Sequence, residues 1–319
     1  MILHDFTKWR GPRKLHRMQP EIPLAAASRA TQRETMKLWD GEISYLEWGG
    51  SGPSLLFSHA TGFNAETYRA LLEPLAARFH IYATDQRGHG FTSLPPESPK
   101  DWVIYRDDTL RFLDGLDGRP MILAGHSMGA IVSVMAALLR PDLVRGLVLV
   151  EPVFVPGDTL SRLWMMWNAR AGNSGPSLAE RAVKRRAEFD SLEAAQSAYQ
   201  GRGAFKSWPN DMLRDYLKGG LLPMEDGRVR LGCSPAWEAE TFRSTPIGAA
   251  GLSRGLRCPA TVIYGGLSTT CSDAQARLFA RGRKGTRRVR VAKATHFLPM
   301  EYPNVVRTEI ARMADLLGV

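Results

Sequence analysis

The sequence predicts an α/β protein with a mostly parallel central sheet, flanked by helices and interrupted by one long helical insertion. Short apolar segments recur along the chain without strict polar alternation, which is typical of parallel strands that are covered on both faces. Helix-like stretches separate these segments, and this alternation indicates right-handed crossovers within one sheet. With 319 residues, 44% of them hydrophobic, the chain is long enough to bury a sizeable core.

The predicted strands and helices begin at residue 35. TMKLW and EISYLEW, joined by the turn pair Asp40-Gly41, predict a β-hairpin. The segments expected to form buried strands are SLLFS (54–58), IYATD (81–85), MILAG (121–125), LVLVE (147–151), TVIYG (261–265) and RVRVA (288–292). The helices expected between them span 65–77, 103–116, 128–139, and 274–279 with its flanks.

The chain divides into three parts. The gap between the fourth and fifth buried strands is too long for one crossover, so residues 153–245 are expected to form a helical cap. The core domain then comprises 35–152 and 246–319, and residues 1–34 form a basic N-terminal arm. Ligands of open α/β sheets bind at the carboxyl ends of strands, so we expect the aromatic-rich cap to cover a site there. Part of its aromatic set is expected to form the insertion's own core.

Composition excludes several classes of protein. No stretch approaches the ~20 apolar residues that a membrane span needs, and charges occupy the N-terminal segment where a secretory signal has its apolar centre. The three cysteines are widely spaced and form no C-x-x-C pair, so neither a disulfide framework nor a metal site is expected. These features predict a cytoplasmic protein with no cofactor, no metal and no membrane partner.

Positive charge is the remaining unusual feature. The formal net charge is +10, and basic residues gather in the arm between Lys8 and Arg17 and again over 281–290. Such clusters suit an acidic partner, but no nucleic-acid-binding motif accompanies either of them. The expected partner is therefore a small-molecule substrate and not a nucleic acid, and the sequence does not predict an oligomeric state.

Ser127 is the candidate nucleophile. It stands in Gly125-His126-Ser127-Met128-Gly129, which fits G-x-S-x-G and lies between the apolar strand MILAG and the apolar helix AIVSVMAALL. A turn tight enough to lift a serine above a sheet leaves no room for side chains at the flanking positions, which explains the two glycines.

His296 is the candidate base. It lies in the loop ATHFLPM, just after the last predicted strand, at the sheet edge where Ser127 is expected to emerge. A nucleophile that comes first in the chain and a histidine that comes last also match the order of elbow-type triads. The neighbouring His126 is expected to point elsewhere on the sharp turn.

These motifs together resemble the α/β-hydrolase family of serine hydrolases, from about residue 35 to the C-terminus, with the insertion in the position of that family's cap domain. GHSMG resembles the nucleophile elbow, and THFLPMEYP (295–303) resembles the histidine loop. DQRGHGFT (85–92) resembles the family's D-x-R-G-x-G-x-S turn, and SHATGF (58–63) stands where the family usually has H-G.

The resemblance extends to the oxyanion hole. One donor is expected to be the backbone N–H of Met128, directly after the nucleophile. The resemblance implies that the second is the N–H of Thr61, in the loop after the SLLFS strand. His59 in that loop is expected to be a structural hydrogen-bonding group. Phe63, with Trp164 and Trp167 from the cap, is expected to contact the apolar part of a substrate.

The third triad member departs from the family pattern. Most relatives carry an Asp in a G-x-x-D motif after the fifth buried strand, and here that stretch reads Gly265-Gly266-Leu267-Ser268. Glu151 is the favoured replacement, because it ends a neighbouring strand at the same edge, where some α/β-hydrolases carry their acid. Asp273 and a Ser–His dyad without an acid are the alternatives.

The predicted activity is hydrolysis of a small to medium carboxylic ester with an apolar or aromatic part, through an acyl-enzyme. A serine at the elbow argues against dehalogenase and epoxide hydrolase chemistry, which need a carboxylate nucleophile. Hydrolysis of a lactone, thioester, amide or C–C bond and acyl transfer use the same machinery and remain open. The missing Asp also leaves open a non-catalytic ligand receptor.

Overall fold

The central sheet positions every candidate residue of the site. The computed structural model describes all residues except 1–30, 97–100, 117, 160–162, 164–166 and 168–175. Within the described part, eight strands form one sheet in the order β1-β2-β4-β3-β5-β6-β10-β11. β1 pairs antiparallel with β2 and β2 pairs antiparallel with β4, whereas the other neighbouring strands are parallel.

The strands match the predicted segments closely. They are β1 (Gln32–Leu38), β2 (Gly41–Trp48), β3 (Ser54–Ser58), β4 (His80–Thr84), β5 (Met121–His126), β6 (Val144–Val150), β10 (Ala260–Gly265) and β11 (Arg287–Val291). The predicted hairpin is present, but β1 already begins at Gln32, inside the segment expected to be an arm. Residues 1–30 of that arm lie outside the described residues.

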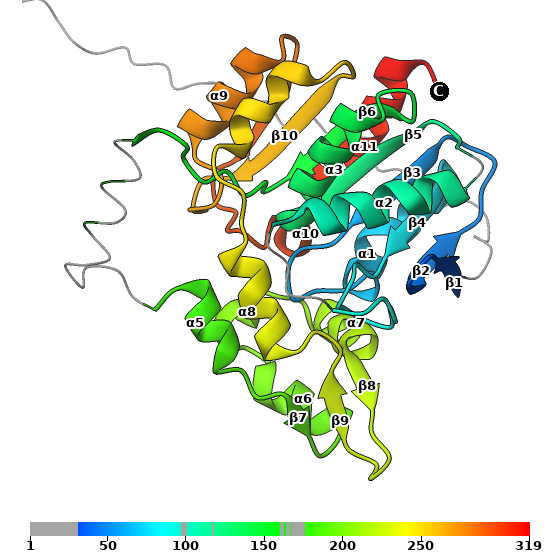
Figure 1. The fold of residues 1–319 in the computed structure, drawn as a ribbon, viewed down its shortest axis with the longest axis vertical. Coiled ribbons are helices and arrows are strands. Elements are labelled where there is room, and N and C mark those ends of the chain that lie inside the picture. Colours follow the sequence, from blue (N-terminus) through cyan, green and yellow to red (C-terminus); the bar gives the residue numbers. More distant parts are fainter. Residues whose placement is uncertain (1–30, 97–100, 117, 160–162, 164–166, 168–175) are drawn as a thin grey trace, which may run out of the picture.

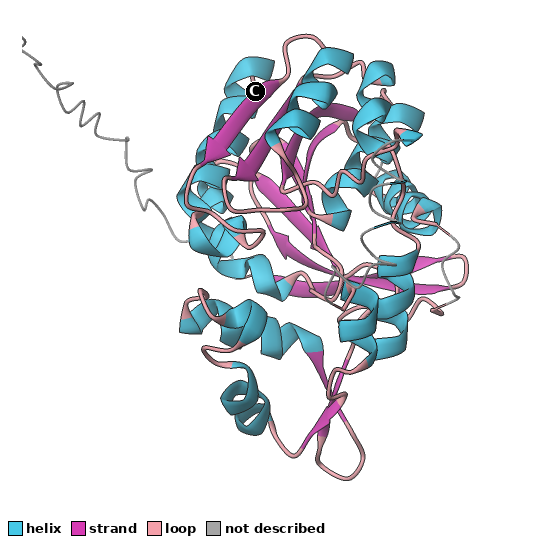
Figure 2. Ribbon diagram, turned by 90° about the vertical axis from the view of Figure 1, so that its left-hand side faces the viewer, coloured by secondary structure: helices cyan, strands magenta, loops and turns pink. Residues whose placement is uncertain are grey.

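Successive residues of the buried strands face opposite sides of the sheet, as the two-residue period of a strand requires. Leu147 and Leu149 of β6 belong to one buried cluster, and Val148 and Val150 to another. Helices α2 (Val103–Gly115), α3 (Met128–Leu139) and α9 (Asp273–Gly282) contribute to the first cluster, whereas α1 (Arg69–Leu72) and α11 (Pro303–Leu317) contribute to the second. Figure 2 shows helices on both sides of the sheet.

The structure differs from the predicted helices in two places. The helix expected over 65–77 is three short pieces, η1 (Glu66–Tyr68), α1 and η2 (Glu73–Ala77). Pro74 lies in the first turn of η2, and because proline has no N–H and its ring clashes with the preceding turn, it breaks a continuous α-helix. Helix α11 was not among the predicted elements.

The insertion contributes helices and a small antiparallel sheet with the order β7-β9-β8. Its described elements are α5 (Leu178–Val183), β7 (Glu188–Phe189), α6 (Leu192–Tyr199), η3 (Gly203–Phe205), α7 (Asn210–Gly220), β8 (Leu221–Pro223), β9 (Val229–Leu231) and α8 (Pro235–Arg243). In Figure 1 they gather at one end of the core. Phe189, Phe205, Trp208 and Tyr216 are buried in the same cluster as the core residues, so the insertion shares apolar packing with the domain beneath it.

None of the helices in the described part of the chain combines the length and the apolar character that crossing a membrane would demand.

Candidate active site

Ser127 occupies a sharp turn between β5 and α3. Its backbone has φ 56° and ψ −113°, a conformation that L-residues rarely adopt. A Cβ on Gly125 would lie 2.4 Å from the carbonyl carbon of Gly129, and a Cβ on Gly129 would lie 2.1 Å from the backbone oxygen of Ser58. The turn therefore closes only with glycine at both positions, as the sequence predicted.

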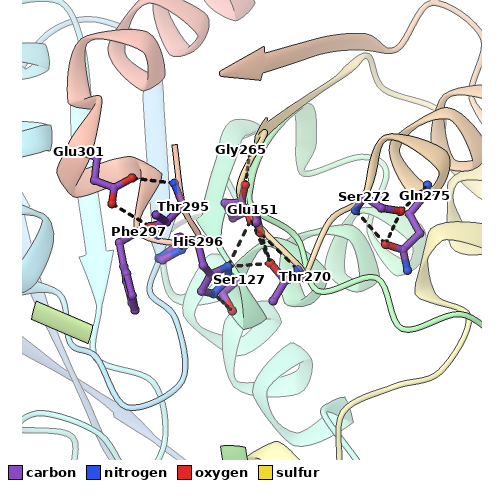
Figure 3. A network of polar contacts seen from close by, with 12 residues as sticks. Ser127, Glu151, Gly265, Thr270, Ser272, Gln275, Thr295, His296, Phe297 and Glu301 are labelled. Atoms are coloured by element: carbon purple, nitrogen blue, oxygen red, sulfur yellow. Dashed lines mark hydrogen bonds and ion pairs between the residues drawn. The ribbon is translucent and has the colours of Figure 1, made fainter. Parts of the chain in front are cut away.

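His296 lies directly against this serine. Its Nε2 is 3.1 Å from Ser127 Oγ, within hydrogen-bond distance. The loop that carries His296 is held by Glu301 of α10 (Leu298–Glu301), whose carboxylate accepts hydrogen bonds from the amide and the hydroxyl of Thr295. Figure 3 shows both contacts beside the imidazole.

Glu151 completes the group at the carboxyl end of β6. One carboxylate oxygen, Oε2, lies 3.3 Å from His296 Nδ1. The carboxylate is fully buried, and the backbone has φ 49°. Ser127 and Glu151 are the two non-glycine residues with positive φ in the described part of the chain. Both strained residues thus lie in the same small cluster, which is where functional sites store backbone strain.

Two hydroxyls from the loop after β10 surround the same carboxylate. Thr270 Oγ1 donates to Glu151 Oε2 over 2.9 Å, and it lies 2.8 Å from His296 Nδ1. Ser268, which occupies the position of the missing Asp, also donates to Oε2, and the amide of Gly265 donates to Oε1. These groups satisfy the buried charge of Glu151, as a carboxylate removed from water requires. Figure 3 shows Thr270 beside the imidazole and the carboxylate, in contact with both.

Asp273, the alternative acid, is engaged elsewhere. It is the first residue of α9, where a carboxylate is favoured by the helix dipole. Its carboxylate accepts a hydrogen bond from the hydroxyl of Tyr264 and pairs with Arg277 and Arg288. These contacts lower its pKa and hold it on the surface, so the structure does not bring Asp273 to His296.

The two residues expected to supply the oxyanion-hole amides contact each other through their side chains. The Thr61 hydroxyl is 3.5 Å from the sulfur of Met128, and both residues are buried. The neighbouring amides of Ala60, Gly62 and Phe63 all donate to protein groups. Within the described residues, the amides of Thr61 and Met128 donate to no other protein group, so both are free to bind an oxyanion.

Two neutral histidines stabilise this loop through hydrogen bonds. His59 Nδ1 donates to the carbonyl of Ala60, and its Nε2 accepts from the amide of Gln86. His89 Nε2 accepts from the amide of Gly62, next to Thr61. Burial lowers the pKa of His59 to about 4, and burial together with the neighbouring His59 lowers the pKa of His89 to about 3. Neutral rings can accept the amide hydrogen bonds on which the loop depends.

His126 links the oxyanion loop to the histidine loop. Its Nε2 donates to the carbonyl oxygen of His296 over 2.8 Å, so its Nδ1 must accept from the hydroxyl of Tyr68 at 2.7 Å. The same hydroxyl accepts the amide of Ala60. Burial is the main reason why the pKa of His126 lies well below its ordinary value. The side chain therefore points away from Ser127, as predicted, but its tie to His296 was not predicted.

A cavity of about 1440 Å³ opens over Ser127 and His296, between the core and the insertion. Phe63 lines it, as expected, together with Trp102, Phe205, Tyr216 and Phe297. Trp167 is 63% exposed and does not belong to the lining, so the structure does not bring this predicted residue to the cavity. Trp164, the other predicted contact from the cap, lies outside the described residues.

One polar cluster interrupts the apolar wall. Arg185, just after α5, pairs with Glu238 of α8 and donates to the hydroxyls of Tyr216 and Tyr199. The cluster sits on the oxyanion loop, because a Cβ on Gly62 would lie 2.4 Å from Glu238 Oε1. Sequence reasoning missed these residues, since no motif marks them and they meet only when the insertion itself folds, with Arg185 and Glu238 53 residues apart in the chain.

Comparisons with known proteins identify the family. The sequence profile of the alpha/beta hydrolase family matches residues 55–309, so the chain belongs to the alpha/beta hydrolase family. It is similar to 2-(acetamidomethylene)succinate hydrolase of Mesorhizobium japonicum, with 30% identity over 267 residues that cover 83% of this chain and 89% of the relative.

Solved structures show the same fold. A crystal structure of E-2-(acetamidomethylene)succinate hydrolase superimposes with a TM-score of 0.73 and 28% identity, covering 89% of this chain and 99% of that one. A thioesterase domain from the curacin biosynthetic pathway superimposes with a TM-score of 0.69 over 89% of this chain and all of that one (100%). At 19% identity, the second likeness speaks for the fold alone.

Proposed function

We propose that the protein is a serine hydrolase that cleaves a carboxylic ester through an acyl-enzyme, with Ser127, His296 and Glu151 as its triad. The observation that supports this most directly is the contact of 3.1 Å between His296 Nε2 and Ser127 Oγ, at the floor of the cavity. In this mechanism Ser127 attacks the carbonyl, and His296 takes its proton and passes it to the leaving alcohol. Water then releases the acid by the same route.

The surrounding groups fit the charges that develop in this reaction. The negative oxygen of the tetrahedral intermediate would be bound by the amides of Thr61 and Met128, each worth roughly 3–4 kcal/mol in comparable enzymes. The positive charge on the imidazole would be stabilised by buried Glu151. The aromatic lining, with Phe63, Phe205 and Phe297, suits a substrate that has an apolar or aromatic part.

Amide hydrolysis is the second candidate. The relative with 30% identity is named for a substrate that combines an acetamido group with succinate. The polar cluster of Arg185, Tyr216 and Glu238 beside the oxyanion loop gives this cavity groups that could bind a polar substituent. The same acyl-enzyme chemistry serves an amide if His296 protonates the leaving nitrogen.

Labelling and a substrate panel test the proposal. A fluorophosphonate probe is expected to modify the wild-type protein on Ser127 and to leave Ser127→Ala unmodified. The panel comprises p-nitrophenyl esters of increasing acyl length, a lactone, a thioester and an anilide. Turnover of the esters that disappears in Ser127→Ala supports the proposed class, and preference for the anilide selects the second candidate. A properly folded wild-type protein with neither an adduct nor turnover contradicts both and favours a non-catalytic receptor.

A further inference from the structure

We propose that Thr270 is a positioning residue that relays the hydrogen bond between His296 and Glu151 and thereby fixes which imidazole nitrogen carries the proton. The inference rests on the proposed function, because it concerns how the base of the same triad is held. Neither the sequence motifs nor the family resemblance assigns a role to this residue.

Distances favour the hydroxyl over the carboxylate as the direct partner of the imidazole. His296 Nδ1 is 2.8 Å from Thr270 Oγ1 and 3.3 Å from Glu151 Oε2. Hydrogen bonds from N–H to oxygen have donor–acceptor distances of about 2.7–3.2 Å, so the direct contact with the carboxylate is longer than usual. The remaining step, from Thr270 Oγ1 to Glu151 Oε2, is 2.9 Å. The bridged path therefore consists of two contacts of ordinary length.

The direction of each proton follows from the chemistry of the carboxylate. An ionised Glu151 can only accept, so the hydroxyls of Ser268 and Thr270 both direct their protons to Oε2. Once its proton is committed, Thr270 Oγ1 can interact with the imidazole only as an acceptor. Nδ1 of His296 must then carry the proton, which leaves Nε2 bare and facing Ser127 Oγ at 3.1 Å. This is the tautomer that a general base requires.

The backbone around Thr270 holds the hydroxyl in place. The carbonyl of Thr270 accepts the amide of Phe154, in the segment that follows Glu151, and its own amide donates to Ser268 Oγ. The loop after β10 is thus tied to the end of β6 by main chain and side chain. In the loop where most relatives place an Asp, this chain has the hydroxyls of Ser268 and Thr270. Both hydrogen-bond to Glu151, the acid at the end of a different strand.

Three substitutions separate this role from a merely structural one. Thr270→Val removes the hydroxyl at nearly constant shape, and Thr270→Ser retains it. Ser268→Ala removes a donor to Glu151 that also bonds to Thr270 but does not itself contact His296. Thr308→Val is the matched control for the Thr to Val change, because among the described residues the exposed Thr308 hydroxyl bonds only to the carbonyl of Asn304 within α11. Thermal unfolding verifies that each variant folds, and Thr270→Ala replaces Thr270→Val if the latter does not.

The expected result is a loss in kcat without a change in KM. Thr270→Val should lower kcat and the rate of fluorophosphonate labelling by about 10- to 100-fold, the effect of losing one charge-assisted hydrogen bond in the transition state. Thr270→Ser should restore most of this rate, and Ser268→Ala should lose only on the order of 3-fold. Thr308→Val should match the wild-type protein.

Other outcomes separate this inference from the proposed function. The relay is refuted while the triad stands if turnover needs Ser127 but Thr270→Val lowers kcat no more than Ser268→Ala does. The same conclusion follows if kcat of Thr270→Ser is as low as that of Thr270→Val. If labelling and turnover do not depend on Ser127, the proposed function fails and the relay fails with it.

Discussion

Replacing Glu151 with Gln should invert the hydrogen bonds around His296. The amide of Gly265 donates to Glu151 Oε1, so a glutamine at this position must place its carbonyl oxygen there. Its NH₂ group then occupies the site of Oε2, where it faces Thr270 Oγ1 at a distance of 2.9 Å in the wild-type protein. Since an NH₂ group donates, the Thr270 hydroxyl must accept from it, and its own proton is left to go to His296 Nδ1 or to Ser268 Oγ, which lies 2.9 Å away. When it goes to His296, Nε2 carries the proton and cannot accept one from Ser127.

The magnitude follows from the loss of the active tautomer. In serine proteases the equivalent acid-to-amide change leaves the geometry intact and lowers kcat by about 10⁴. The same factor corresponds to about 5.4 kcal/mol of transition-state stabilisation at 1.36 kcal/mol for each tenfold change. We therefore expect Glu151→Gln to lower kcat by about 10³- to 10⁴-fold while KM changes little, since no part of the carboxylate is exposed.

The assay compares four proteins by ester hydrolysis and by the rate of fluorophosphonate labelling: wild type, Glu151→Gln, Asp273→Asn and the double variant Glu151→Gln/Thr270→Val. Asp273→Asn should retain wild-type rates, because the Asp273 carboxylate is bound to Tyr264, Arg277 and Arg288 and not to His296. The double variant should be at least as active as Glu151→Gln, because valine cannot donate to Nδ1. Activity of Glu151→Gln within about tenfold of wild type would refute the role of the acid. If kcat of the double variant falls below that of Glu151→Gln by the full factor that Thr270→Val causes in the wild-type background, the tautomer argument is refuted.

Three further predictions follow from the same structure. Ser268→Asp in the Glu151→Gln background should recover at least about tenfold in kcat, since it returns a carboxylate to the usual family position; no gain in steady-state turnover would contradict this. Gly62→Ala should lower the free energy of unfolding by about 1–2 kcal/mol, because alanine is strained at a φ of +76°. It should also lower kcat, because the new Cβ would meet Glu238 beside the oxyanion loop. Gly227→Ala, with φ +84° and no atom within 4 Å, should show the stability loss alone in urea unfolding and unchanged turnover. Finally, the pKa values of about 4 for His59 and 3 for His89 lie below the ordinary 6.5, so the unfolded chain binds more protons as the pH falls below 6.5. The free energy of unfolding should be insensitive to these two groups above about pH 7, and their contribution should fall by about 2.4 kcal/mol between pH 6 and 5, which urea titrations would show as a falling midpoint.

Local patterns determined the fold and the position of the candidate nucleophile. Strands, turns and helices are encoded by short-range periodicity and by glycines, so β5, the Ser127 turn and α3 could be read from a single stretch of sequence. Pro74 shows the limit of this approach, because an apolar period over 65–77 predicted one helix where the proline leaves three short pieces.

The remaining members of the site depend on tertiary structure. Glu151 and Asp273 both stood near strand ends in the sequence, and only the packing of β6 beside β10, with Val150 opposite Ile263, brings Glu151 to the loop that carries Thr270. Thr270 and Glu151 are 119 residues apart, and His296 and Glu151 are 145 apart. Hydroxyls and carboxylates at such separations leave no periodic or motif signal. The sequence by itself therefore determined that a serine would be raised above a parallel sheet, and the tertiary structure decided which acid, through which hydroxyl, meets its histidine, because only the register of distant strands sets those distances.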